Sequence, residues 1–408
     1  MSGLGDPVVQ DDPYPYYRWR AAHGPVWWED EYDLYVIAGH PEAKVALLDA
    51  GTFSSRPSGT RGFGDEAAEA YHHVLAERGW ARTPTLQRTD PPTHVRHRKL
   101  VNRVFTPARI RELIPSIEVI AHDLIDDFVD TGHCEFVSEF CLPMPGILIA
   151  EQLGLDRSDY RTFRRWADAM LSLATRRMSV EEALAEAELE LEAQHFLAGE
   201  FERRRGEPRD DLISHLVHAH GDDEAPLTMN ELQDLLHQLI TGGFETTTSA
   251  LAKGMWLLLM HPDQLVRVRA EPELLKNFIE EALRFDSPVQ GLWRHTTCPT
   301  TVGDVTIPAD APVMVRYGAA NRDERAFEHP DRFDVSRPEA KNHLAFGFGP
   351  HYCVGAALAR QELLTSFTIL LERLDDIELA EPLPKPIHVP SFFLRPMKRL
   401  PLRFTARR

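Results

Sequence analysis

Cys353 stands in a segment whose composition suits a metal ligand. Residues 346–355 read Phe-Gly-Phe-Gly-Pro-His-Tyr-Cys-Val-Gly, and a helical pattern begins directly after them. The glycines permit positive φ angles and let the backbone pass close to a flat or bulky group. A position just before a helix N-terminus favours the cysteine thiolate, and a thiolate held in a turn is a good ligand for iron. The segment therefore indicates iron ligation as one role for Cys353.

Three other roles compete for this cysteine. A lone cysteine is more often a small buried apolar side chain. Zinc needs three or four Cys or His ligands at close spacing, and His343 and His351 come without a Cys-x-x-Cys or His-Glu-x-x-His motif. A nucleophilic thiol needs a positioned base, and His351 lies only two residues away, which is poor geometry for a pair. Cys353 by itself leaves these roles open.

A second group of residues lies at the centre of a long predicted helix. Thr228-Met229-Asn230-Glu231 has the form of a capping box, and leucines at helical spacing allow the helix to continue to His261-Pro262. Gly242-Gly243 interrupts it at a cost of about 1 kcal/mol per glycine relative to alanine, and three threonines follow at 246–248. We expect these small residues to clear space at mid-helix, for a close helix crossing or for a ligand.

The cysteine segment and the helix centre together match a known family. Phe346-x-x-Gly349-x-x-x-Cys353-x-Gly355 resembles the haem-binding signature of the cytochrome P450 family. Gly243-x-Glu245-Thr246 is similar to the oxygen-activation motif of that family, although Gly242 stands where the family usually has alanine. The resemblance spans at least residues 90–360 and implies haem b with Cys353 as the axial ligand of the iron.

The resemblance also implies roles for other residues. Thr246 would hydrogen-bond the dioxygen, and Glu245 would relay protons to it from solvent. Glu281-x-x-Arg284 is similar to the Glu-x-x-Arg element of the family, whose third partner would be Arg332, although a pair three residues apart on a helix is more often a surface pair. The haem propionates need cations as partners. The positions that match those of the family are His94, Arg98, Arg294 and His351. Each of these residues, taken alone, also fits a solvated surface group.

Apolar and small residues at the family's substrate positions would line the pocket, although the aromatic ones fit a core equally well. These candidates are Phe63, Trp80, Met170, Leu173, Ile240, Gly242, Gly243, Leu292, Trp293, Phe392 and Phe393.

The elements that must position these residues are mostly helices. We expect a mainly α fold with small β-sheets (α+β), the cytochrome P450 fold, in one domain over residues 1–408. The helical body would cover about 94–285 and 354–374, and residues 60–93 would be irregular. Strand patterns cover about 25–40, 296–318 and 384–406.

The composition argues against several classes of protein. The 408 residues carry a formal net charge of −18, which opposes binding to nucleic acid. Four cysteines are too few for a disulfide scaffold, and no apolar run approaches the ~20 residues of a membrane span. We therefore expect a cytoplasmic protein without a membrane anchor, and a monomer.

One basic stretch departs from this acidic composition. Residues 94–112 contain a single acidic residue, Glu112, and six cations, which suit either a solvated helix face or a docking patch for an acidic ferredoxin. The cations are Arg96, Arg98, Lys99, Arg103, Arg109 and Arg111.

The resemblance implies a haem-thiolate monooxygenase that activates O2 and hydroxylates, or otherwise oxidises, a hydrophobic small molecule. No flavin or iron–sulfur module is fused to the chain, so we expect electrons from NAD(P)H to arrive through a ferredoxin reductase and a ferredoxin. Two alternatives keep the haem: a peroxide-driven or non-oxygenating P450, and a non-catalytic haem-binding sensor or ligand carrier. A zinc or thiol hydrolase is the third, and no Gly-x-Ser-x-Gly, Gly-Lys phosphate loop or His-Glu-x-x-His supports it.

Overall fold

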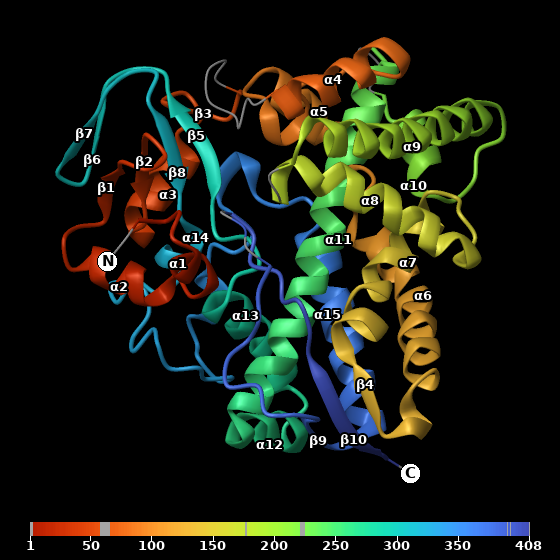
Figure 1. Ribbon diagram of the computed structural model, residues 1–408, viewed down its shortest axis with the longest axis vertical. Helices are drawn as coiled ribbons and strands as arrows, with labels where there is room; N and C mark the ends of the chain where they lie inside the picture. Colours follow the sequence, from red (N-terminus) through yellow and green to blue (C-terminus); the bar gives the residue numbers. More distant parts are fainter. Residues whose placement is uncertain are drawn as a thin grey trace. The chain divides into compact units, whose positions relative to one another are not determined.

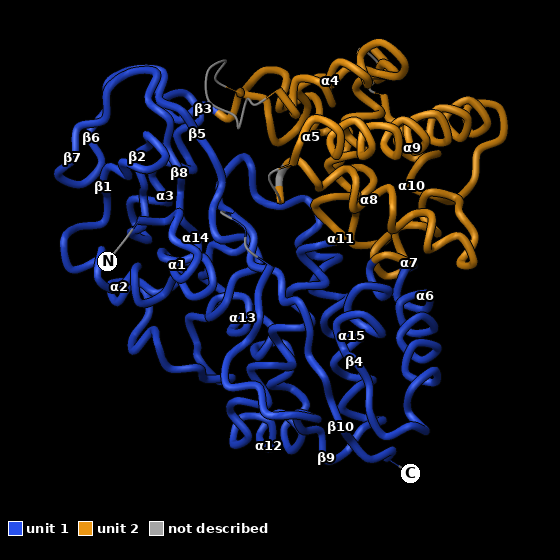
Figure 2. Tube along the Cα trace, in the orientation of Figure 1, with its two compact units in different colours: residues 1–54, 112–145, 245–408 blue, residues 55–111, 146–244 orange. Residues whose placement is uncertain are grey.

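The computed structural model describes residues 3–57, 66–175, 178–220, 225–389, 391 and 393–407 (Figure 1). The chain forms two compact units (Figure 2). Unit 1 comprises Met1–Ser54, Glu112–Pro145 and Glu245–Arg408, and unit 2 comprises Ser55–Arg111 and Gly146–Phe244. Every strand described below belongs to unit 1. The prediction of a single domain over the whole chain stays a prediction.

The largest sheet of unit 1 has five strands in the order β1-β2-β8-β5-β3. The β2–β8 pair is parallel and the other pairs are antiparallel. The strands, in chain order, are β1 (Val26–Glu29), β2 (Leu34–Ile37), β3 (Phe53–Ser54), β5 (Leu292–Thr296) and β8 (Pro312–Val315). An antiparallel sheet in the order β4-β10-β9 and a two-stranded hairpin complete the β-structure that the model describes. They consist of β4 (His133–Glu135), β9 (Leu374–Leu379) and β10 (Pro401–Ala406), and of β6 (Thr300–Val302) with β7 (Val305–Ile307).

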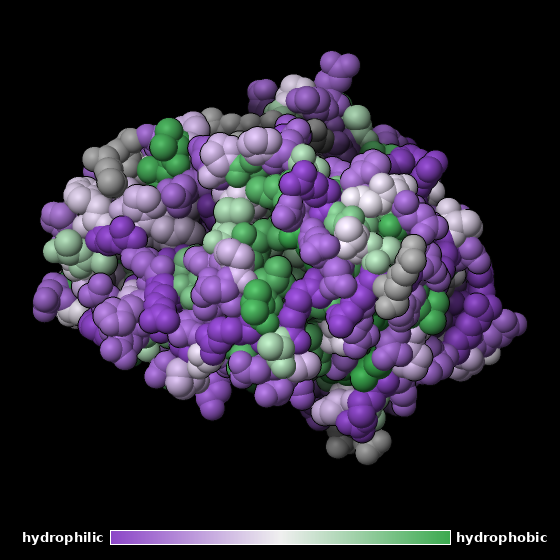
Figure 3. Space-filling view, turned by 90° about the horizontal axis from the view of Figure 1, so that it is seen from below, coloured by the Kyte–Doolittle hydropathy of each residue, from purple (hydrophilic) through white to green (hydrophobic). Residues whose placement is uncertain are grey.

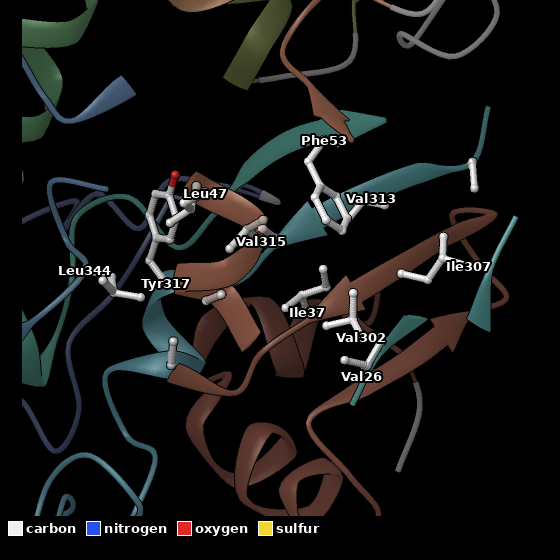
Figure 4. Packing of buried hydrophobic residues seen from close by; sticks show 14 residues of the cluster. Val26, Ile37, Leu47, Phe53, Val302, Ile307, Val313, Val315, Tyr317 and Leu344 are labelled. Carbon is white, nitrogen blue, oxygen red and sulfur yellow. The ribbon is translucent and has the colours of Figure 1, made fainter. Parts of the chain in front are cut away.

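Side chains alternate across the five-stranded sheet, and strand β8 buries residues on both of its faces. On β8, Val313 and Val315 join one apolar cluster, whereas Met314 joins another. This follows from the two-residue period of a strand. Figure 4 shows the first cluster, in which Leu47 of helix α3 (His40–Leu48), Tyr317 and Leu344 lie with the strand residues. The cluster reaches residues 343–355, which we call the cysteine loop, because Phe348 packs against it.

The described part of unit 1 also contains other helices. They are α1 (Pro7–Asp11), α2 (Tyr14–Ala21), α12 (Pro262–Ala270), α13 (Leu274–Phe285), α14 (Tyr317–Ala320) and α15 (Ala356–Arg373). Single turns of 3₁₀ helix occur at Val129–Thr131, Ala340–Asn342 and Gly349–His351, and a π-helical turn occurs at Val137–Cys141.

The described part of unit 2 is built from helices. They are α4 (Glu66–Arg78), α5 (Thr93–Asn102), α8 (Tyr160–Thr175), α9 (Val180–Gly206) and α10 (Leu212–Val217), with 3₁₀ turns at Leu86–Arg88 and Arg157–Asp159. Three helices continue from one unit into the other along the chain: α6 (Pro107–Asp126), α7 (Pro143–Gln152) and α11 (Met229–Met260).

Helix α4 corrects the expectation that residues 60–93 are irregular. Ala67, Tyr71 and Leu75 recur every four residues and pack against Ala187 and Leu191 of α9. The Tyr71 hydroxyl donates a hydrogen bond to the buried Glu190 carboxylate. The helical period was therefore present in the sequence, between polar residues that hid it.

The predicted fold class is confirmed, because helices dominate and the sheets are small. One local expectation was wrong and one strand was not predicted. Strand β4 interrupts the predicted helical body, and β9 directly follows the predicted helix α15, before the stretch in which strands had been expected. Both strands pair with β10, which lies far away in sequence from β4, so local patterns could not reveal the β4 pairing.

Polar side chains predominate on the face shown in Figure 3, with smaller groups of hydrophobic atoms between them. None of the described helices combines the length and the apolar character of a membrane-spanning segment.

Candidate active site

Within the cysteine loop, Cys353 lies between the 3₁₀ turn Gly349–His351 and the start of α15, just before a helix as its sequence predicts. The Cys353 N–H donates to the Phe346 carbonyl at 2.9 Å. Gly347 and Gly349 have φ angles of 71° and 70°, which only glycine adopts readily. A Cβ on Gly349 would also come within 2.7 Å of the Leu47 carbonyl oxygen. Two glycines and one hydrogen bond thus fix the path of the loop around Cys353.

The cysteine side chains separate into two kinds. Cys353 and Cys298 are exposed, whereas Cys134 and Cys141 are buried, and none of these four described residues forms a disulfide. Burial raises the pKa of both buried thiols, which suits inert core positions. The exposed position of Cys353 argues against the buried apolar role. Among the described residues there is also no cluster of three His, Cys, Asp or Glu side chains that could hold a metal ion, so the zinc alternative lacks a ligand set there.

Tyr317 connects the cysteine loop to strand β5. Its hydroxyl would lie 3.6 Å from a Cβ on Gly347, and the ring belongs to the cluster in Figure 4. Burial raises the pKa of Tyr317, and the charges of Arg294 and Cys353 both act on it. Arg294 and Cys353 therefore both influence the ionisation of one buried phenol. No sequence pattern predicted a role for Tyr317.

The four predicted propionate partners occur as one pair in each unit. In unit 2, His94 is buried and Arg98 is half-buried, one helical turn apart on α5. In unit 1, Arg294 is buried on β5 and donates to the Trp293 carbonyl at 2.6 Å, and His351 is half-buried beside the cysteine. Their role toward a cofactor stays a prediction.

Helix α11 has the bounds and the cap that its sequence predicts. The Glu231 N–H donates to Thr228 Oγ1 at 3.3 Å, and the Thr228 N–H donates to Glu231 Oε2 at 2.8 Å. The helix is mostly buried, yet it opens at its centre: Gly242 is exposed, and a Cβ added there would meet no described atom within 4 Å beyond the local helix backbone. Thr246 lies one turn farther on the same face and is half-buried, as is Glu245. The opening at Gly242 therefore adjoins the carboxyl group of Glu245 and the hydroxyl group of Thr246.

The Glu-x-x-Arg pair is fully buried, but its third partner is not the predicted one. Glu281 and Arg284 are both 0% exposed and share two hydrogen bonds of 2.7 and 2.9 Å. The guanidinium that completes the set is Arg337, whose Nε donates to Glu281 Oε1 at 3.1 Å. The Arg332 side chain is 69% exposed, and only its carbonyl accepts from Arg337 and Arg284. Arg332 was therefore the wrong choice, because its backbone rather than its side chain faces the pair.

The predicted pocket residues have mixed environments. Met170 and Ile240 are buried, Trp80 is half-buried against His195, and Trp293 is 37% exposed. Three of the candidates pack against apolar clusters, namely Leu173, Leu292 and Phe393. Phe63 and Phe392 lie outside the described residues. A Cβ on Gly243 would come 3.3 Å from Ile149 Cδ1, so its smallness also serves helix packing. The lining role of this set stays a prediction.

Glu362 on α15 is a buried acid that no sequence pattern predicted. It is 4% exposed, and Thr247, the neighbour of Thr246, hydrogen-bonds its side chain. Burial raises the pKa of Glu362 to about 8, and the Thr247 bond only partly offsets this. A helical projection does not reveal it, because Thr365 and Ser366 on the same face are also polar and yet buried. Glu362 is therefore largely protonated at neutral pH.

We expect Glu362→Gln to stabilise the protein at pH 8 by a few kcal/mol and to change little at pH 4. The unfolded carboxyl ionises near 4.5 and the folded one near 8, so wild-type stability falls as pH rises between these values. The neutral amide does not ionise and escapes this loss. Thermal unfolding midpoints measured across this pH range check the prediction, with Glu372→Gln, at an exposed glutamate of the same helix, as control. Parallel pH profiles for wild type and Glu362→Gln would contradict it.

The cysteine loop is suited to supply the thiolate ligand of a haem. Cys353 is exposed, and a Cβ on Gly355 would lie in van der Waals contact with Cys353 Sγ, at 4.0 Å. Soft thiolate ligands, glycines that allow close approach and neighbouring cations form a donor set that suits an iron porphyrin.

Comparison with known proteins agrees with this site. Residues 179–402 match the family model described as Cytochrome P450. The chain is 35% identical to 6-deoxyerythronolide B hydroxylase of Saccharopolyspora erythraea, over 91% of this chain and 90% of that protein. It is 33% identical to cytochrome P450 monooxygenase PikC of Streptomyces venezuelae, over 99% and 94% of the two chains. The structure of cytochrome P450 CYP109Q5 from Chondromyces apiculatus superposes with a TM-score of 0.85 at 34% identity, covering 99% and 98%.

The chain therefore belongs to the cytochrome P450 family, and the predicted resemblance is confirmed. Within that family it is a monooxygenase of the bacterial type, an enzyme that uses haem b and O2.

Proposed function

We propose that this monooxygenase hydroxylates, or otherwise oxidises, a hydrophobic small molecule with electrons delivered by a ferredoxin. The observation that carries the proposal is the open centre of α11, where the exposed Gly242 adjoins Glu245 and Thr246. A protein that only binds haem has no use for an acid and an alcohol beside such a space. The name of the hydroxylase relative, 6-deoxyerythronolide B hydroxylase, supports hydroxylation as the reaction.

Haem b, when bound, supplies the chemistry that combines O2, two electrons and two protons with the substrate to give an oxygenated product and water. The chain's own residues would hold it: Cys353 as the thiolate ligand, with His94, Arg98, Arg294 and His351 as partners of the propionates. Thr246 would donate a hydrogen bond to the dioxygen, and Glu245 would carry protons from solvent to that hydroxyl. We propose that the two compact units make up one P450 domain to this end.

The electrons would pass from NAD(P)H through a ferredoxin reductase to a ferredoxin. The basic stretch 94–112 supplies the proposed docking patch, but its six cations are not equivalent. Arg96 pairs with Glu231 at 2.6 Å, and Arg109 is 12% exposed and pairs with Asp210 at 2.7 Å. Lys99, Arg103 and Arg111 are exposed. The exposed three are therefore the better docking candidates, and Arg109 stabilises unit 2 instead.

We expect Arg103→Glu to slow reduction by ferredoxin about threefold at low ionic strength, because charge complementarity acts mainly on the rate of association. Stopped-flow reduction at two salt concentrations measures this. Arg399→Glu, at an exposed arginine of unit 1, serves as control. The patch is excluded if both variants reduce at the wild-type rate, or if the Arg103→Glu deficit persists at high salt.

A screen of hydrophobic compounds for haem spectral shifts, followed by turnover assays, tests the function as a whole. We expect compounds that shift the spectrum to cause NAD(P)H consumption with ferredoxin and its reductase, and to yield oxidised product. Efficient turnover with hydrogen peroxide alone would instead identify a peroxide-driven enzyme. We further propose a cytoplasmic monomer, which agrees with four cysteines that are all free of disulfides.

A further inference from the structure

We propose that Glu280 and Arg360 form a clamp that fixes the cysteine loop and thereby keeps the Cys353 thiolate on the haem iron. This inference rests on the proposed role of Cys353. In it, Glu280 and Arg360 are positioning residues, since neither would touch the haem iron or the substrate.

The clamp is an ion pair between two helices. Arg360 of α15 donates from Nε to Oε1 of Glu280 on α13, and from Nη2 to Oε2 at 2.8 Å. The two side chains are 31% and 15% exposed. Burial opposes ionisation of Glu280, but hydrogen bonds from Arg360 and His343 outweigh it and lower the pKa of Glu280 to about 2. The carboxylate is therefore charged across the physiological range, and a bidentate pair of this kind holds a fixed geometry.

Arg360 contacts the loop at two positions that precede the cysteine. Its guanidinium carbon lies 4.4 Å from the centre of the Phe346 ring, which is a cation–π contact. Its Nη1 donates to the Tyr352 hydroxyl at 3.1 Å. Phe346 accepts the Cys353 N–H, and Tyr352 directly precedes the cysteine. One guanidinium thus holds both residues that determine where the Cys353 backbone lies.

Glu280 contacts the beginning of the same loop. His343 is buried, and its Nε2 lies 3.2 Å from Glu280 Oε2. His343 Nδ1 accepts the Ala345 N–H at 3.0 Å, which places the proton of the neutral ring on Nε2, toward the carboxylate. Glu280 therefore faces residue 343 of the loop at 3.2 Å, and through Arg360 it holds the loop at residues 346 and 352.

The clamp is separate from the buried set around Glu281. Consecutive glutamates of α13 point to different partners, because Glu281 bonds Arg284 and Arg337, whereas Glu280 bonds Arg360. A change at Glu280 or Arg360 therefore leaves the fully buried pair in place. Such a change removes the contacts that hold the loop around Cys353. Contacts of this kind determine how firmly a metal ligand stays in position.

The test uses haem-loaded Arg360→Met, Glu280→Gln and the double variant. We expect each single variant to lose the thiolate-type Soret band of its reduced carbon monoxide complex at least about threefold faster than wild type on mild warming. Because the two residues act as one unit, the double variant should be no worse than the worse single one. Arg403→Met is the matched control, since it breaks an exposed pair with Glu378 on β10 and β9 and does not involve the loop.

Far-UV circular dichroism of the same samples separates positioning from general stability. We expect the Soret band to be lost well before the helical signal in the clamp variants, and together with it in Arg403→Met. The clamp is refuted if wild type, clamp variants and control lose the band at equal rates, or if band and helix content always disappear together. A wild-type protein without the thiolate-type band would instead refute the proposed role of Cys353.

Discussion

Replacing Arg337 by methionine should lower the free energy of unfolding by about 3–5 kcal/mol, the cost of removing one partner from a buried ion pair. Arg337 is 6% exposed and bonds Glu281, which is fully buried. It also donates to the carbonyl oxygens of Glu328, His329 and Arg332. Methionine would fill much of the volume of the arginine side chain. It would leave the three carbonyl groups without this donor, and the negative charge of Glu281 would be less well compensated. Urea unfolding of the purified protein measures the change.

Arg332→Met is the matched control for this prediction. The Arg332 side chain is largely exposed and lies 3.8 Å from Asp334, so its loss should change the free energy of unfolding by no more than about 0.5 kcal/mol. Its carbonyl, which is the part that accepts from Arg284 and Arg337, remains in the variant. A larger effect at Arg332 than at Arg337 would show that Arg332 is the third partner of Glu281 and Arg284, as predicted from sequence.

Thr246→Ala should keep haem bound while the yield of oxidised product per NAD(P)H falls about tenfold or more, a typical loss when a positioned proton donor is removed. The electrons would then appear as hydrogen peroxide, because O2 with two electrons and two protons gives either that product or, with substrate, an oxygenated molecule and water. Thr246 is half-buried on the open face of α11, so alanine there should not disturb packing. Peroxide and product are measured against NAD(P)H consumed.

Thr248→Ala is the control for the relay, because Thr248 is buried on a different face of the same helix. It should keep the wild-type ratio of product to NAD(P)H. Wild-type coupling in Thr246→Ala, or equal uncoupling in both variants, would remove Thr246 from the proposed proton path.

The cysteine loop and the central helix were accessible from sequence because their signals are local. Glycines, the cysteine and the start of α15 lie within a few residues of one another, and the capping box fixes where α11 begins. Arg332 was chosen in error because both it and Arg337 lie in an irregular segment, where no periodicity tells which side chain points inward. Only the three-dimensional path of that segment decides between them.

The residues that sequence reasoning missed depend on contacts between distant segments. Tyr317 lies beside the loop through tertiary packing, and Glu280 meets Arg360 across 80 positions of sequence. Glu362 carries a buried carboxyl whose protonation follows from burial, which composition alone does not show. Strand β4 likewise becomes a strand through its pairing with β10 at the other end of the chain.

The absorption spectrum of the reduced protein under carbon monoxide tests the central claim, iron ligation by Cys353, most directly. We predict a red protein whose complex shows the strongly red-shifted Soret band of a thiolate ligand, and we predict that Cys353→Ser loses this band. A colourless protein after growth with ample iron and haem precursor, or a spectrum typical of histidine ligation, would contradict it.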